Sequence, residues 1–62
     1  ELGQLMRDAE QGDAEARCSL GQGYARGWGV ETDLDVAFYW YAKVAEQGID
    51  VEEELERLKN ND

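Results

Sequence analysis

The chain has 62 residues, 42% of them hydrophobic, and its 15 acidic and 6 basic residues give a formal net charge of −9. A chain of this length forms one small domain at most, and its charge repels nucleic-acid phosphates and anionic lipid headgroups. One cysteine and no histidine exclude an intramolecular disulfide and the usual zinc ligand sets. No apolar run approaches the roughly 20 residues of a membrane span. We therefore expect no nucleic-acid partner, no membrane insertion, no metal and no other cofactor.

A four-residue segment occurs twice in the sequence. Ala-Glu-Gln-Gly at 9–12 recurs at 45–48, 36 residues later, and at this offset Leu5 corresponds to Tyr41. A fixed period between 20 and 50 residues is typical of solenoid proteins. Both copies close a helical pattern with glycine, a common helix stop. The sequence therefore predicts stacked helical units.

The first half of the chain contains two expected helices. Residues 1–11 have the pattern of a truncated helix, and a second helix is expected over 13–26 with Asp13 as its N-cap. Three side chains recur within it at four-residue steps: Ala16, Leu20 and Tyr24. Gly21 and Gly23 each cost this helix up to about 1 kcal/mol relative to alanine. We interpret them as points of close contact with another helix.

A turn and two more expected helices follow. Residues 27–32 contain two glycines around Trp28, which suit positive φ angles and predict a helical hairpin. The next helix is expected over 33–47, capped either by Thr32 in a capping box with Asp35 or by Asp33. A last helix is expected over 50–59, with three apolar residues on one face: Val51, Leu55 and Leu58.

The combined pattern resembles the Sel-1-like repeat. The residues that carry the resemblance are the segment 9–16, Leu20, Gly21, Tyr24, Gly27, Gly29, Val30, Asp33, Ala37, Trp40, Tyr41, Lys43 and the segment 45–48. The resemblance covers one complete repeat, 13–48, and the end of a preceding one at 1–12. Residues 49–62 lack its signatures, and we interpret them as a C-terminal cap helix and tail with a polar outer face.

The resemblance implies an all-α fold: an α/α solenoid of antiparallel helical hairpins, related to tetratricopeptide repeats. It also implies a protein-protein interaction scaffold or adaptor in the bacterial periplasm or cytoplasm, while the composition leaves the compartment open. Small side chains let helices approach and larger ones fill the space between them. The predicted packing residues are Ala16, Leu20, Gly21, Tyr24, Ala37, Trp40, Tyr41 and Ala45.

A second stripe on the helix 13–26 is the candidate contact surface for a protein or peptide partner. Its members fall three or four residues apart: Glu15, Cys18, Gln22 and Arg26. Related solenoids present such faces on a concave surface, and the alternative is that this stripe is plain solvated surface. Trp28 is either an exposed interface anchor or a lid on the helix ends. Phe38 or Tyr39 is a candidate surface for self-association.

An enzymatic function is not expected. Cys18 needs a nearby base or cation to become a nucleophile, and without histidine only Arg17 or Arg26 is close to it in the sequence. No pair of carboxylates is singled out by spacing. The alternative to a scaffold is a small autonomous acidic protein that regulates a partner by binding its basic surface.

Overall fold

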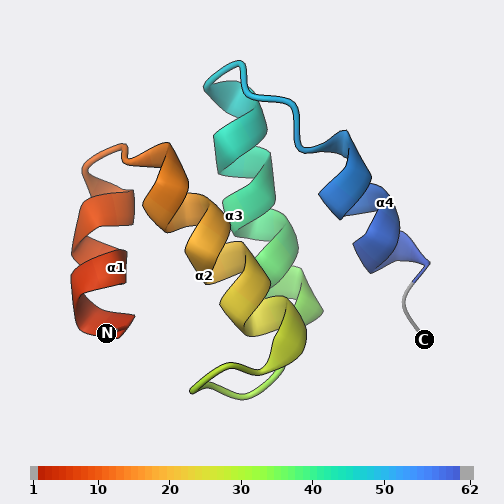
Figure 1. The fold of residues 1–62 in the computed structure, drawn as a ribbon, viewed down its shortest axis with the longest axis horizontal. Helices are drawn as coiled ribbons and strands as arrows, with labels where there is room; N and C mark the ends of the chain where they lie inside the picture. Colours follow the sequence, from red (N-terminus) through yellow and green to blue (C-terminus); the bar gives the residue numbers. More distant parts are fainter. Residues whose placement is uncertain (1, 61–62) are drawn as a thin grey trace.

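Four helices make up the part of the chain that the computed structural model describes, residues 2–60 (Figure 1). Helix α1 spans Leu2–Glu10, α2 spans Ala14–Arg26, α3 spans Leu34–Glu46 and α4 spans Glu52–Lys59. No strand occurs within 2–60. The prediction of an all-helical chain is confirmed, and the observed helices lie close to the ranges expected from the sequence.

Aspartate side chains define where α2 and α3 begin. The Asp13 carboxylate accepts hydrogen bonds from the backbone N–H groups of Glu15 (3.0 Å) and Ala16 (3.5 Å). Asp33 accepts one from the N–H of Val36 at 3.3 Å, so Asp33 rather than Thr32 caps α3. These bonds satisfy donors that a helix N-terminus otherwise leaves unpaired.

Glycine ends the helices at both copies of the repeated segment. Gly12 follows α1 with φ 101°, and Gly48 follows α3 with φ 88°. The N–H of Gly12 donates to the carbonyl of Ala9 (3.0 Å), and that of Gly48 to the carbonyl of Ala45 (2.9 Å). A side chain with a Cβ atom rarely adopts these angles. Both copies of the segment therefore end a helix in the same way, with a glycine that turns the backbone.

The core lies on both sides of α3. One cluster joins α1, α2 and α3 through Ala9, Ala16, Leu20 and Trp40. The other joins α3 to α4 through Ala37, Tyr41, Val44, Val51 and Leu58. Trp40 and Tyr41 are adjacent in the sequence, and each belongs to a different cluster. In Figure 1, α2 and α3 lie in the middle of the molecule, with α2 crossing in front of α3, and α1 and α4 lie at the two sides.

The structure corrects one of the predicted packing residues. Ala45 is exposed, and Val44 is fully buried instead. Ala37, Tyr41 and Val44 lie at positions i, i+4 and i+7, which share one face of a helix, whereas Ala45 is rotated a further 100° or so. The four-residue periodicity therefore assigned Ala45 wrongly to the buried face of α3. Of the remaining packing residues, Tyr24 is half-buried and the other six are buried.

A polar bridge connects three helices at one end of the domain. The Arg17 side chain of α2 donates from Nε to the carbonyl of Ala9 and from a terminal nitrogen to Oε1 of Gln47, both at 2.9 Å. Nε2 of Gln47 donates in turn to the carbonyl of Gly12 at 2.8 Å. The ends of α1 and α3 are thus fixed to each other through α2.

None of the helices within 2–60 has the combined length and apolar character that crossing a membrane requires.

Candidate functional site

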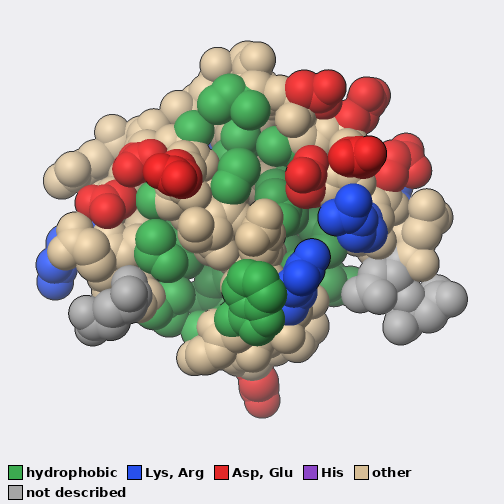
Figure 2. Space-filling view, viewed as in Figure 1, with side chains coloured by type: hydrophobic (Ala, Val, Ile, Leu, Met, Phe, Trp, Pro, Cys, Tyr) green, Lys and Arg blue, Asp and Glu red, His purple; other side chains and the backbone are tan. Residues whose placement is uncertain are grey.

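The candidate site is one face of α2, here called the α2 outer face. It comprises the predicted contact residues Glu15, Cys18, Gln22, Arg26 and Trp28. The first four lie on one side of α2 because their spacing matches the helical repeat. Glu15, Arg26 and Trp28 are exposed, and Cys18 and Gln22 are half-buried. Figure 2 shows hydrophobic side chains reaching the surface between charged groups on the face that Figure 1 presents.

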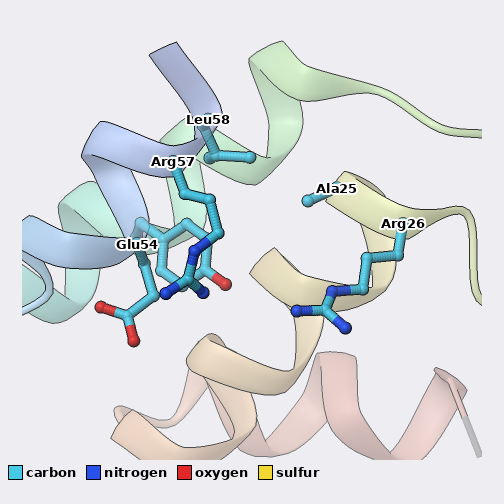
Figure 3. A pocket seen from close by; sticks show the side chains of 6 residues that line it. Ala25, Arg26, Glu54, Arg57 and Leu58 are labelled. Atoms are coloured by element: carbon cyan, nitrogen blue, oxygen red, sulfur yellow. The ribbon is translucent and has the colours of Figure 1, made fainter. Parts of the chain in front are cut away.

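A cavity of about 260 Å³, the α2–α4 cavity, lies on one side of this face. Its lining residues come from α2, α3 and α4: Ala25, Arg26, Tyr41, Glu54, Arg57 and Leu58. In Figure 3 the guanidinium groups of Arg26 and Arg57 reach into the cavity from opposite sides. The Glu54 carboxylate lies beyond Arg57, away from Arg26, in the same view.

A second cavity of about 220 Å³, the α1–α2 cavity, lies on the other side. Its lining is mainly apolar: Leu2, Leu5, Ser19, Leu20, Gln22, Gly23, Tyr24, Trp28 and Val30. Apolar clefts with a few polar groups are the usual form of binding sites in proteins. This cavity is therefore suited to an apolar side chain or helix face.

The linings of the two cavities share two positions that are related by the 36-residue offset. Leu5 lines the α1–α2 cavity, and its counterpart 36 residues later, Tyr41, lines the α2–α4 cavity. Gln22 and Leu58 are related in the same way. One cavity is lined by α1, α2 and the turn that follows α2, whereas α3 and α4 contribute to the other. The second cavity has an additional wall, which Ala25 and Arg26 of α2 provide.

The predicted stripe is therefore divided between two cavities. Arg26 faces α4, whereas Gln22 and Trp28 face α1. Trp28 remains 57% exposed, and the Arg26 guanidinium carbon lies 5.2 Å from the centre of its ring. This cation–π contact links the two halves of the site. Glu15 is exposed on the same helix face but lines neither cavity.

Cys18 is in contact with the core on the α4 side of α2. Burial raises the pKa of its thiol above the ordinary value, and the negative charges of Glu54 and Glu15 raise this pKa further. The thiol therefore stays protonated at neutral pH. A protonated thiol is a poor nucleophile, so the environment of Cys18 is unfavourable for covalent chemistry.

The structure separates the two candidates for self-association. Phe38 is half-buried against the core cluster between α3 and α4, so it does not offer a free surface. Tyr39 is 53% exposed. Its ring meets Trp40 edge-on at 5.0 Å, and Nζ of Lys43 lies 5.5 Å from its centre. Tyr39 is the member of the pair that a second copy of the chain can reach.

Sequence reasoning missed the contribution of α4 to the site. The sequence predicts a polar outer face for residues 49–62, yet Glu54 and Arg57 line the α2–α4 cavity. Arg57 and Lys59 are the two bases among the many acids of this helix. The available signal was a base in the last turn of α4, Arg57, next to the buried Leu58.

The described residues form a small all-helical domain in which one helix face separates two cavities. Comparisons of the chain with protein-family models, with curated proteins and with solved structures find no match.

Proposed function

We propose that this chain is part of an α/α solenoid of Sel-1-like repeats and acts as a protein-protein interaction scaffold or adaptor. The observation that carries the proposal is the equivalence of the helix pairs α1–α2 and α3–α4. The same four residues, Ala-Glu-Gln-Gly, close the first helix of each pair, and the last of them is a glycine with positive φ. Two residues of the α1–α2 cavity, Leu5 and Gln22, also have counterparts 36 positions later in the α2–α4 cavity. Units that repeat in this way stack on their neighbours in solenoids.

The proposed contact surface is the α2 outer face together with the α1–α2 cavity. Trp28 and Arg26, both exposed, are of the residue types most enriched at interface hot spots. The adjoining cavity offers apolar walls for a partner side chain. In the proposed solenoid, a preceding helix covers the outer side of α1, and the concave face of α2 stays open to a partner.

The acidic residues of α4 fit the proposed cap. Glu52, Glu53 and Glu56 are exposed, whereas Val51 and Leu58 are buried against α3. A terminal repeat requires such a polar outer face to end the stack in water. A regulator that binds a basic surface would use the same acids as its contact, so salt dependence separates the two functions.

The architecture can be tested by inserting a second copy of residues 13–48 after Gly12. Gly48 of the inserted copy then precedes Asp13, as Gly12 does in the natural chain, so every junction is preserved. A solenoid predicts one cooperative unfolding transition at a higher temperature, because each added repeat contributes an interface. Two separate transitions, or an unchanged melting temperature, would contradict stacking.

The interaction surface can be tested by site-specific photo-crosslinking in extracts of the cells that express the protein. A photoreactive residue at Gln22 is expected to capture a partner, and one at Ala42, exposed on α3, is the matched control. An excess of chain without the photoreactive residue should reduce capture of the partner. A Trp28→Ser chain should reduce capture only weakly, and a Tyr39→Ser chain should reduce it as well as the natural chain does. Equal capture at both positions would contradict a contact surface on α2. Loss of capture at 150 mM salt or so would contradict the scaffold and favour the acidic regulator.

A further inference from the structure

Two arginines from different helices meet at the α2–α4 cavity. The whole chain has only 6 basic residues against 15 acidic ones, so a pair of cations at one cavity is unusual for its composition. Arg26 ends α2 and Arg57 lies in the last turn of α4. Figure 2 shows basic side chains gathered between these helices, with acidic ones toward the start of α4.

The charge of the lining is positive. Arg26 and Arg57 contribute two positive charges and Glu54 one negative charge, which leaves an excess of one. Figure 3 places Glu54 beside Arg57 and away from the space between the two arginines. Arg26 is held by the Trp28 ring at 5.2 Å, a contact that orients the guanidinium without neutralising it.

Tyr41 adds a hydroxyl group to the same lining. Its side chain is 3% exposed. Burial raises the pKa of Tyr41, as do the thiolate that Cys18 forms only at high pH and the negative charge of Glu54, while Arg26 and Arg57 act in the opposite direction. The hydroxyl is therefore protonated at neutral pH and can donate a hydrogen bond.

We propose that Arg26, Arg57 and the Tyr41 hydroxyl form a binding site for a carboxylate group. Guanidinium groups bind carboxylates through paired, charge-assisted hydrogen bonds. A cavity of about 260 Å³ is at the small end of the range for ligand pockets, which suits a carboxylate with a short apolar group near Ala25 and Leu58. The choice of a peptide as the carrier of this carboxylate rests on the proposed function, whereas the site itself does not.

The surroundings define the remainder of the peptide. Exposed Glu52, Glu53 and Glu56 lie on the same helix as Arg57, and the chain has a net charge of −9. A peptide with several acids is repelled by this field, whereas lysines beside a single carboxylate are attracted. The expected ligand is one carboxylate, from a peptide C-terminus or an acidic side chain, within a basic segment.

Three synthetic peptides test the site in solution. The first is N-acetylated Lys-Lys-Ala-Ala with a free carboxylate, the second is its C-terminal amide, and the third is an amide with an internal Glu between lysines. Binding is followed by the NMR signals of the Arg26 and Arg57 side chains at constant ionic strength. If only the first peptide binds, the ligand is a C-terminal carboxylate. If the third peptide binds as well, the site also accepts the carboxylate of an acidic side chain. Equal binding of the first and second peptides would overturn the proposal.

Variants identify the residues responsible. Arg26→Gln and Arg57→Gln are each expected to weaken binding roughly tenfold. Arg7→Gln makes the same change at an exposed position of α1 outside both cavities and should leave affinity nearly unchanged. Glu54→Gln should strengthen binding several-fold, and the control Glu56→Gln should do so less. An Arg7 effect as large as that of Arg26, or no gain from Glu54→Gln, would overturn the site.

The outcome is separable from the test of the scaffold. Crosslinking at Gln22 reports on the α1 side of α2, and the peptide titration reports on the α4 side. Loss of the carboxylate site with crosslinking intact leaves the scaffold standing. Peptide binding without a crosslinked partner retains the carboxylate site and removes the scaffold.

Discussion

Gly21 and Gly23 provide a matched pair for testing how closely α2 and α3 pack. Both lie inside α2, so alanine at either position gains up to about 1 kcal/mol of helix stability. A Cβ atom on Gly21 would lie 3.0 Å from Cε2 and Cζ of Tyr41, whereas on Gly23 the nearest atom is the Trp28 carbonyl oxygen at 3.9 Å. Overpacking of a core typically costs about 1–3 kcal/mol.

The difference between the two variants isolates the steric cost, because the helix gain is common to both. We expect Gly23→Ala to stabilise the domain and Gly21→Ala to be less stable than Gly23→Ala by about 1–3 kcal/mol. For a domain of this size, 1 kcal/mol corresponds to a melting temperature difference of roughly 4–8 °C.

Circular dichroism with urea and heat measures both quantities. In a Tyr41→Leu background the gap between the two alanine variants should narrow, because the ring that meets the new methyl group is gone. Equal stabilisation by both substitutions in the natural background would refute the close contact between α2 and Tyr41.

Three further measurements address other parts of the fold. Gln47→Ala removes the bridge to Gly12 and Arg17 and should cost about 1 kcal/mol. Gln11→Ala, at the corresponding position 36 residues earlier and likewise exposed, should stay within roughly 0.5 kcal/mol. Equal losses in urea unfolding would contradict the bridge. An alanine at Gly27 would adopt φ 72° and place its Cβ 2.6 Å from Oγ1 of Thr32. Gly27→Ala should therefore lower the free energy of unfolding by at least about 1 kcal/mol, and by less in a Thr32→Ala background. An unchanged melting temperature would count against this turn. Because the pKa of Cys18 is raised in the folded state, the unfolded chain loses its thiol proton first, so the free energy of unfolding should fall as the pH rises above roughly 9; a Cys18→Ala variant with the same decline would contradict this assignment.

The helices and their ends were predictable from the sequence because local signals determine them. Asp13 and Asp33 each precede a helix and can bond to its first N–H groups. Gly12 and Gly48 lie at positions that require positive φ. Such signals act over a few residues and do not depend on how the helices pack. Ala45 was predicted wrongly because its burial depends on the direction from which α2 and α4 approach α3.

The cavities were not predictable because they depend on contacts distant in sequence. Arg26 and Arg57 are 31 positions apart, and they line the same cavity only because α4 packs on α3. The spacing of Cys18, Gln22 and Arg26 places them along one side of α2. It did not indicate that Gln22 faces α1 while Arg26 faces α4.

The polar bridge of α2 has no equivalent at α4. Arg17 connects α2 to the carbonyl of Ala9 at the end of α1, and 36 residues later the corresponding positions are Glu53 and Ala45. A carboxylate cannot donate to a backbone carbonyl, so α4 cannot form the equivalent bridge to the end of α3. It is held instead by Val51 and Leu58 in the core. Arg57 of α4 lines the α2–α4 cavity opposite Arg26, whereas the α1–α2 cavity has a mainly apolar lining. The proposed carboxylate site therefore lies where α4 departs from the 36-residue pattern.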